Sequence, residues 1–346
     1  MAAETFLAEI REQPEALRRL VARPEVGEAA AALRSRGVDT VRLVGHGSSD
    51  AAASYGVYAF GLLPAWTAFR DSISLTTYYE AEVDMSQSAV VAISQSGETP
   101  DVVEYVARTR ARGALTVAVT NEPESELAAA AELTIPLAAG AERAVAASKT
   151  LLNTFAAVAL LAGAVAGRGD VATGVGRVAD QLEEALPGLE EAVAPLAPTF
   201  AFVGRMYVVG RGIEFGTARE IALKLTETCR VAAEPWTSTD LSHGPIAAVD
   251  SLFPVWAIAS RDESLPALLA AAELARKAGA TLVASGSAAD EVAGTEFRLP
   301  VPEPPLPVLS PLLSVVPGQL FAATVARAKG FDPDKPVGLT KITLAQ

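Results

Sequence analysis

The sequence predicts an α/β protein built from two tandem doubly wound domains, each around a parallel sheet. Apolar runs of strand length alternate with helical segments of roughly ten to fifteen residues, a pattern typical of parallel sheets. Short motifs recur at an offset of 165 or 166 residues, which indicates that one domain has been duplicated. A chain of 346 residues is long enough for two such domains, each with its own core.

The first domain is expected to follow three short amphipathic helices at 3–11, 14–22 and 25–36. Proline residues separate these helices, and Gly37 ends the third. Strands are then expected at 41–44, 66–69, 89–93, 115–119 and 133–136. One helix is expected to end at about residue 63, and two further helices are expected at 101–112 and 125–131. This order of elements predicts the first parallel sheet.

The second domain is expected to repeat the first after a proline-rich stretch. Helices at 146–166 and 171–186 precede this stretch, which ends near Phe200 and is expected to be a linker. Residues 208–212 (V-V-G-R-G) match 43–47 (L-V-G-H-G), residues 257–259 (A-I-A) match 92–94 (A-I-S), and residues 275–280 match 109–114. We therefore expect domains at 1–190 and 201–346.

Composition excludes several classes of protein. Lys and Arg total 28 against 41 Asp and Glu, so the net charge of −13 disfavours a nucleic acid as partner. Cys229 is the single cysteine, which rules out an intramolecular disulfide. With His46 and His243 as the two histidines, the chain lacks a Cys/His metal cluster. We therefore expect neither a metal nor a cofactor.

Targeting signals are also not evident. The N-terminal residues M-A-A-E-T-F-L-A-E-I are acidic and amphipathic, unlike the basic flank and apolar core of a signal peptide. The longest apolar run, 151–166, is interrupted by Asn153 and Thr154 and is shorter than a membrane-spanning helix requires. It predicts a buried helix, and we expect a cytoplasmic protein without membrane contact.

The run V-A-I-S-Q-S-G-E-T-P at 91–100 is the segment best suited to binding an anion. A strand ends abruptly in hydroxyls, an amide and a glycine, and Thr99 and Pro100 suit the N-cap and first position of a helix. Free N–H groups at a helix N-terminus, together with neutral hydroxyls, make a site for a phosphate dianion. A surface turn followed by a helix cap can have the same residues, so this run alone gives only weak support for a phosphate site. The other motifs of the chain strengthen that hypothesis.

The two copies differ in their chemistry. In the second copy the loop becomes A-S-R-D-E-S at 259–264, without the glycine and with most of the phosphate-binding groups lost. The helix after the second G-x-G carries Glu220, Lys224 and Glu227 on one face. A solvated ion-pair stripe has the same spacing, but the apolar neighbours indicate a buried helix, where a Glu beside a Lys can act as a base. The first copy is thus expected to bind the phosphate, and the second copy is expected to supply acid and base groups.

Two further residues are candidates for chemistry. His243 lies in a polar loop ended by Gly244 and Pro245, and histidine is the natural acid or base near neutral pH. Lys341 stands near the C-terminus among alternating apolar residues. It is either an exposed lysine of a tail strand or an amine that pairs with an anion or condenses with a carbonyl.

Together the motifs resemble those of the sugar isomerase (SIS) domain family, a tandem flavodoxin-like α/β fold that binds phosphosugars. The resemblance covers nearly the whole chain from about residue 40 and rests on G-H-G-S-S, I-S-Q-S-G-E-T, V-A-A-S-K-T, G-R-G-x5-A-x-E-x3-K-L-x-E, H-G-P and L-T-K. The nearest likeness is to the isomerase half of glucosamine–fructose-6-phosphate aminotransferase and to stand-alone amino sugar phosphate deaminases. The resemblance implies that the phosphate ligands are Ser48, Ser49, Ser94, Gln95, Ser96 and Thr99.

The resemblance also implies roles for the candidate catalytic residues. Glu227 would move a proton between C1 and C2 of the sugar, assisted by Lys224. His243 would open the sugar ring from a neighbouring subunit, so a homodimer is the expected active unit. Lys341 would close over the sugar, where it could form an imine with a ketose carbonyl. The sugar contacts would be Val145, Ala147 and Glu220.

Some positions depart from the family pattern and bear on the choice of substrate. Ala147 stands where the aminotransferase has a serine, Ser242 replaces a lysine before H-G-P, and the bulky Trp236 lies upstream. The sequence has no glutaminase segment and no nucleophilic cysteine at its N-terminus. Glutamine-dependent amidotransfer is therefore not expected.

The leading hypothesis is an enzyme that converts a phosphorylated amino sugar, glucosamine 6-phosphate, into fructose 6-phosphate and ammonia by abstracting the C2 proton. The same abstraction could lead N-acetylglucosamine 6-phosphate to lose its C3 hydroxyl, or end in aldose–ketose isomerisation, and the sequence leaves these outcomes open. A non-catalytic phosphosugar sensor is disfavoured. The segment before the first strand lacks the basic charge and the room for a DNA-reading domain.

Overall fold

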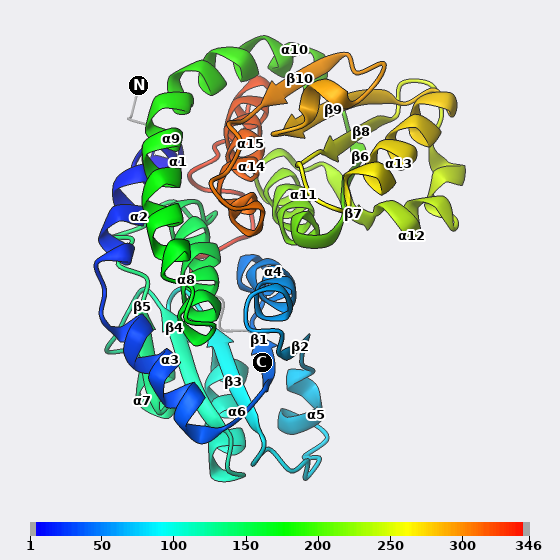
Figure 1. Cartoon of the computed structure of the whole chain (residues 1–346). Coiled ribbons are helices and arrows are strands. Elements are labelled where there is room, and N and C mark those ends of the chain that lie inside the picture. The colour runs from blue at the N-terminus through cyan, green and yellow to red at the C-terminus, as the bar shows by residue number, and fades with distance from the viewer. Residues whose placement is uncertain (1–4, 342–346) are drawn as a thin grey trace. The chain divides into compact units, whose positions relative to one another are not determined.

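The computed structural model describes residues 5–341, which form two compact units, each around one five-stranded sheet (Figure 1). The first-sheet unit comprises residues 15–142, 149–176 and 340–341, and the second-sheet unit comprises residues 5–14, 143–148 and 177–339. The predicted domain limits at 1–190 and 201–346 stay a prediction, whereas the predicted α/β class and the two sheets are confirmed.

The first sheet is entirely parallel and has the strand order β2-β1-β3-β4-β5. Its strands are β1 (Thr40–Val44), β2 (Thr67–Arg70), β3 (Ser88–Ile93), β4 (Leu115–Thr120) and β5 (Leu133–Pro136). Every residue of β3 and β4 is buried. Helices cover both faces of a doubly wound sheet, so its central strands consist of continuous apolar runs, which is why their sequences were recognisable.

The helices of the first half lie where the sequence predicts them, except α5, a short helix that the sequence did not predict. They are α1 (Thr5–Arg11), α2 (Gln13–Val21), α3 (Glu25–Arg36), α4 (Ser48–Leu62), α5 (Ile73–Thr77), α6 (Pro100–Ala111), α7 (Glu126–Ala130) and α8 (Lys149–Val165). Gly37 ends α3 with φ of 71°, as expected of a C-terminal glycine. All but one residue of α8 is buried, which confirms that the long apolar run is a core helix.

The second sheet repeats the topology of the first. Its strands are β6 (Arg205–Gly210), β7 (Ala232–Thr237), β8 (Pro254–Ile258), β9 (Thr281–Gly286) and β10 (Phe297–Pro300), all parallel in the order β10-β9-β8-β6-β7. The first strand of each copy thus lies between the second and the third. This identity of strand order confirms the duplication that the motif offsets predicted.

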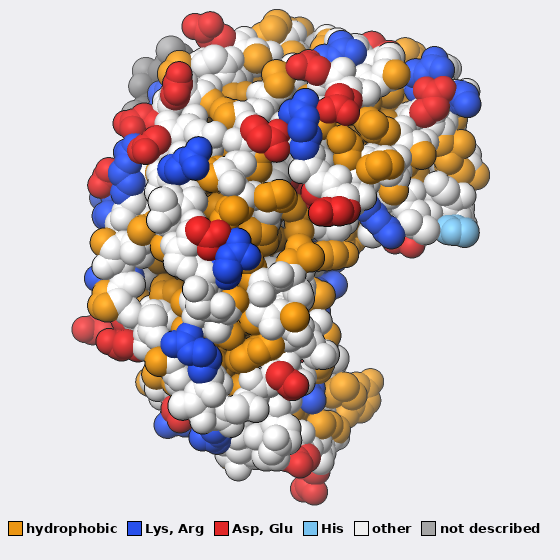
Figure 2. Space-filling view, in the orientation of Figure 1, with side chains coloured by type: hydrophobic (Ala, Val, Ile, Leu, Met, Phe, Trp, Pro, Cys, Tyr) orange, Lys and Arg blue, Asp and Glu red, His pale blue; other side chains and the backbone are white. Residues whose placement is uncertain are grey.

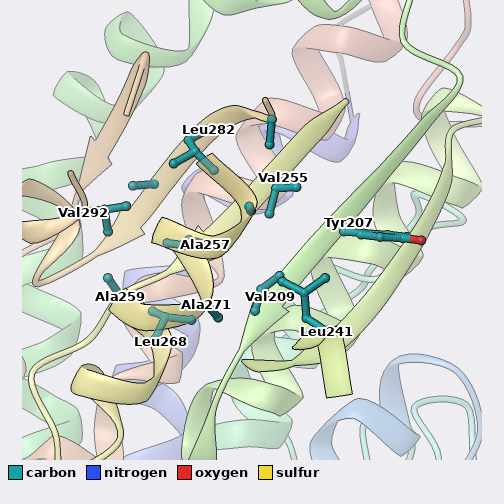
Figure 3. Close-up of a cluster of buried hydrophobic side chains, with 14 of the residues drawn as sticks. Tyr207, Val209, Leu241, Val255, Ala257, Ala259, Leu268, Ala271, Leu282 and Val292 are labelled. Atoms are coloured by element: carbon teal, nitrogen blue, oxygen red, sulfur yellow. The ribbon is translucent and has the colours of Figure 1, made fainter. Parts of the chain in front are cut away.

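The core of the second-sheet unit is formed by strands and helices together (Figure 3). The second-sheet unit also contains α11 (Phe215–Cys229), α12 (Ser238–Ser242), α13 (Leu265–Lys277), α14 (Pro311–Ser314) and α15 (Val316–Ala328). Val209, Val255 and Leu282 of β6, β8 and β9 belong to one buried cluster with Leu241 of α12 and Leu268 of α13, and Val209 lies beside Leu241 in Figure 3. Burial of this apolar surface stabilises the packing of α12 and α13 on the sheet.

The proline-rich stretch differs from the expected linker because it is helical. Helix α9 (Gly169–Val193) runs through Pro187, and α10 (Ala197–Phe200) follows after one 3₁₀ turn. A proline inside a helix costs about 3 kcal/mol. Leu189 and Val193 lie beyond the proline and are buried, and the packing of this apolar face offsets that cost.

One further segment, Pro307–Ala328, has the length and mean hydropathy (1.6) of a membrane span, but 94% of its most apolar window is buried in the fold. This burial identifies it as a core segment of the second-sheet unit. On the face seen in Figure 2, acidic and basic side chains are interspersed over the described residues. That face therefore carries no continuous basic stripe.

Candidate active site

The first-sheet unit has a topological switch point between β1 and β3, where the strand order reverses. In doubly wound folds, ligands bind at such a point, in the crevice outside the carboxyl ends of the strands. The turn 45–49 follows β1 and starts α4, and the loop 94–99 follows β3 and starts α6. Two helix N-termini and all six predicted phosphate ligands therefore lie at this edge of the sheet.

The turn 45–49 lies close to both flanks of the loop 94–99, namely the end of β3 and the start of α6. A Cβ on Gly45 would lie 2.9 Å from the carbonyl oxygen of Ile93, so only glycine lets the turn approach the loop this closely. His46 Nε2 lies 2.7 Å from a carboxylate oxygen of Asp101, in the first turn of α6. The predicted ligands Ser48 and Ser49, both half-buried, follow directly in the chain.

The loop 94–99 is braced by its own hydroxyl groups. Gly97 has φ of +67°, and a Cβ there would lie 1.9 Å from Ser125 Oγ, so the loop requires glycine. The backbone N–H of Gly97 donates to Ser94 Oγ at 3.2 Å, and that oxygen lies 3.1 Å from Thr99 Oγ1. Thr99 and Pro100 occupy the N-cap and first position of α6 as predicted, but the Thr99 hydroxyl contacts Ser94 instead of capping the helix.

A pocket of about 640 Å³ opens beside this loop. It is lined by Gln95, Ser96, Glu98, Glu122, Pro123, Glu124, Ser125, Glu142 and Lys341. Of the predicted site residues, the pocket brings together Gln95, Ser96 and Lys341. The lining does not include Ser48, Ser49, Ser94 or Thr99. The roles that the resemblance implies for these residues stay predictions.

Lys341 reaches this pocket through an ion pair that the sequence did not predict. Its Nζ lies 2.8 Å from Glu142 Oε2, and the Glu142 side chain is fully buried. Glu142 also accepts hydrogen bonds from the backbone N–H of Thr150 at 3.0 Å and from its hydroxyl at 2.6 Å. A carboxylate held in this way fixes the lysine amine at the pocket wall. No local pattern in the sequence signals this pair, because Glu142 and Lys341 are 199 residues apart.

The second-sheet unit carries the predicted acid and base groups on α11. Lys224 and Glu220 are buried, whereas the Glu227 side chain is 23% exposed. Lys224 Nζ lies 2.5 Å from Glu227 Oε2 and 3.5 Å from Glu220 Oε1. The predicted shared face and burial of this helix are therefore confirmed. A carboxylate that is partly open to solvent and fixed by a buried ammonium is placed to exchange a proton with a ligand.

The remaining predicted residues of the second-sheet unit are less enclosed. His243 is exposed and follows α12, where its backbone N–H donates to Asp240 O at 3.0 Å. Val145 and Ala147 are half-buried in the segment 143–148. The backbone N–H of Val145 donates to Asp334 O at 3.2 Å, which anchors that segment within the unit.

Two stretches of the chain, residues 36–164 and 200–328, match the SIS domain family model. A glutamine–fructose-6-phosphate aminotransferase (isomerizing) of Thermus thermophilus is 34% identical over 359 residues, which cover 97% of this chain and 58% of that protein. The corresponding enzyme of Aeropyrum pernix is 34% identical over 350 residues, with 97% and 56% covered. The chain thus spans less than two thirds of the length of these curated relatives.

Solved structures show the same likeness. A provisionally assigned phosphosugar isomerase from Silicibacter pomeroyi DSS-3 has a TM-score of 0.84 and 30% identity, covering 96% of this chain and all of that one. The C-terminal domain of glucosamine-fructose-6-phosphate aminotransferase from Francisella tularensis has a TM-score of 0.86 at 24% identity, with 96% and 98% covered, and so shows the fold alone. The chain therefore belongs to the SIS domain family, with two SIS domains and homology to the isomerase half of glutamine–fructose-6-phosphate aminotransferase.

Proposed function

We propose that the protein is an enzyme of hexosamine 6-phosphates that converts glucosamine 6-phosphate into fructose 6-phosphate and ammonia. The observation that carries this proposal is the arrangement on α11, where the half-buried Glu227 carboxylate is held 2.5 Å from the buried Lys224 ammonium. The relationship to aminotransferases whose name includes fructose 6-phosphate and isomerisation supports the choice of sugar phosphate. We further propose that the enzyme acts in the cytoplasm, as expected of soluble sugar phosphate metabolism.

In the proposed reaction, Glu227 removes the C2 proton of the open-chain aldose, whose C2 amine enters as an ammonium group, and transfer of an ammonium proton to O1 leaves a neutral C1–C2 enolamine. Return of a proton to C1 gives the C2 iminium of fructose 6-phosphate. The amine of Lys341 then adds to C2 and displaces ammonia, and water hydrolyses the resulting imine to release the ketose and restore the amine. Lys224 holds the Glu227 carboxylate in position for this proton transfer.

Proton NMR in D₂O tests this function, with glucosamine 6-phosphate and N-acetylglucosamine 6-phosphate in separate samples. The proposal predicts loss of the C2 proton signal and appearance of fructose 6-phosphate and ammonia in the first sample. A vinylic signal in the second sample would instead identify a dehydratase, which eliminates the C3 hydroxyl. Binding without proton exchange or product in either sample would identify a phosphosugar sensor and overturn the proposal.

We propose that the loop 94–99 binds the phosphate group. The double variant Ser96→Ala/Thr99→Ala is expected to weaken binding of glucosamine 6-phosphate by roughly 10- to 100-fold, because in this proposal each hydroxyl would donate a hydrogen bond to the charged phosphate. Affinity for unphosphorylated glucosamine should stay at its low initial value. Isothermal titration with both sugars measures the two effects.

The double variant Ser72→Ala/Ser74→Ala is the matched control for this experiment. These two hydroxyls also lie close together, 3.0 Å apart, but at an exposed site at the start of α5. Their removal should change neither affinity. An equal loss of affinity for both sugars in the loop variant would contradict the phosphate assignment.

We propose that the active unit is a homodimer in which His243 acts across subunits. Two observations support this: His243 is exposed, and Leu75, Tyr78, Tyr79 and Val83 form a run of exposed large apolar side chains on and after α5. Such surfaces are typical of contacts between proteins.

Mixing equal amounts of the inactive variants His243→Ala and Glu227→Gln under conditions that allow subunit exchange should restore about a quarter of the wild-type turnover. Random exchange makes half of the dimers mixed, and one of the two sites in each mixed dimer is intact. Each variant incubated alone is the control. If the exchanged mixture, verified by mass spectrometry, stays as inactive as its components, His243 does not act across subunits.

A further inference from the structure

The second copy of the fold places a buried carboxylate at its own topological switch point. Strands β6 and β8 pair in the same register as β1 and β3, at an offset of 165 residues. Glu214, at the end of the 3₁₀ turn after β6, therefore matches Ser49 of the first copy, and Ser260 matches Gln95. Glu214 and Ser260 thus stand where the first copy has two of its candidate phosphate ligands.

Four hydroxyl groups surround the Glu214 carboxylate. Oε1 accepts hydrogen bonds from Ser260 Oγ at 2.6 Å and from Ser310 Oγ. Oε2 accepts from Thr217 Oγ1 at 2.6 Å and from Ser314 Oγ at 2.7 Å. An ionised carboxylate has about four lone-pair sites, and these hydroxyls occupy all of them. The carboxylate is thereby solvated by the protein instead of by water.

In the described part of the chain, the hydrogen-bond partners of the Glu214 carboxylate are all neutral hydroxyls. The Glu214 side chain is only 2% exposed, and within residues 5–341 no lysine, arginine or histidine lies within ion-pair distance of it. Burial raises the pKa of Glu214 above its ordinary value, and the four hydroxyl donors oppose that shift. The site therefore surrounds both carboxyl oxygens with neutral hydroxyls, and neutral hydroxyls are also the groups proposed to bind phosphate in the first copy.

The hydroxyl donors join two other segments to the start of α11. Ser260 lies in the loop after β8, whereas Ser310 and Ser314 lie at the two ends of α14. Thr217 belongs to the first turn of α11 itself. Glu214 immediately precedes α11, the helix that carries Glu220, Lys224 and Glu227, so the hydrogen bonds of its carboxylate fix where that helix begins.

We propose that the Glu214 carboxylate is an internal ligand, which occupies the anion position of the second copy and positions the helix that carries Glu227. Glu214 is thus a positioning residue that acts through α11 and does not contact the substrate. The position is filled by the chain itself, so the second copy does not take up an external anion there.

The variant Glu214→Ala tests this proposal because it removes a CH₂–COO⁻ group, which has the shape of acetate. The hydroxyls of Ser260 and Thr217 then lose their acceptor, whereas Ser310 Oγ keeps Ser260 Oγ at 2.7 Å and Ser314 Oγ keeps the carbonyl oxygen of Ser310 at 3.0 Å. Tm should fall by roughly 5–10 °C, since these buried donors lose their acceptor. Acetate should then raise Tm in a saturable manner, whereas chloride at equal ionic strength should not. Differential scanning calorimetry over both salt series measures this.

Glu214→Gln is the matched control, because the amide fills the same volume. Acetate should not raise Tm of this variant or of the wild type above the values in chloride. If Glu214→Ala does not fold, the same measurements are made with Glu214→Ser. This variant introduces serine, the residue at the matching position of the first copy, Ser49. Equal effects of acetate and chloride would overturn the proposal, and so would failure of both variants to fold in acetate.

Turnover of glucosamine 6-phosphate tests the positioning role, and this part rests on the proposed function. In Glu214→Ala, kcat should fall at least 10-fold while KM changes little. Acetate should restore kcat, and half of this restoration should be reached at the acetate concentration that gives half of the rise in Tm. Rescue of Tm without rescue of kcat would overturn the positioning role. If the wild type itself shows no turnover, the proposed function fails, but the acetate dependence of Tm still tests the internal ligand.

Discussion

Replacing Glu227 with glutamine is expected to lower kcat for glucosamine 6-phosphate by roughly 10²- to 10⁴-fold, the usual contribution of a positioned general base. The amide has the size of the carboxylate and can still accept a hydrogen bond from Lys224, which lies 2.5 Å away in the wild type. It cannot take up the C2 proton. The affinity for the phosphosugar should therefore change little, and kcat and kcat/KM should fall together.

Steady-state kinetics and titration with the phosphosugar measure these two quantities. Glu273→Gln is a matched control, because Glu273 also pairs with a cation three residues away on a helix, Arg276 at 2.6 Å, but at an exposed position of α13. That variant should retain wild-type kcat. If Glu227→Gln keeps more than about a tenth of wild-type turnover, Glu227 is not the base.

Replacing Lys341 with methionine is expected to lower kcat at least 10²-fold, because the pocket loses the amine that displaces ammonia in the proposed mechanism. Lys341 is the matching cation of the buried Glu142, at 2.8 Å, so the variant also loses the group that neutralises this carboxylate. Lys341→Arg separates the two effects. Arginine keeps the positive charge and can pair with Glu142, but its guanidinium does not form an imine.

The arginine variant should therefore be nearly as inactive as the methionine variant while its Tm stays close to that of the wild type. Treatment of the wild type with substrate and borohydride should reduce the imine and attach the sugar phosphate to Lys341, which peptide mass spectrometry detects. Neither variant should show this adduct. A fully active arginine variant together with an unmodified wild type would assign Lys341 an electrostatic role.

Local patterns predicted the elements that form the candidate site. The apolar run before Ser94 and the Thr99–Pro100 pair marked the end of β3 and the start of α6, because both signals depend on neighbouring residues alone. The shared face of Glu220, Lys224 and Glu227 was predictable for the same reason. Residues three and four apart lie together on any helix, whatever packs around it.

Local patterns failed where packing outweighed them. The prolines after Leu186 indicated a linker, yet α9 continues through Pro187 because Leu189 and Val193 are buried beyond it. The N-cap position of Thr99 was correct, but its hydroxyl contacts Ser94. A position in the chain determines which groups are near, whereas the rotamer is selected by the surrounding loop.

By itself, then, the sequence determined the fold class, the duplication, the family and the helix face that carries Glu227. Only the tertiary structure decided which distant residues meet. Glu142 and Lys341 are 199 residues apart, and Glu214 is 96 residues from Ser310. Such contacts depend on strand order and on the packing of whole segments, which leave no local signal in the chain. Both buried carboxylates were therefore found only once the chain was folded.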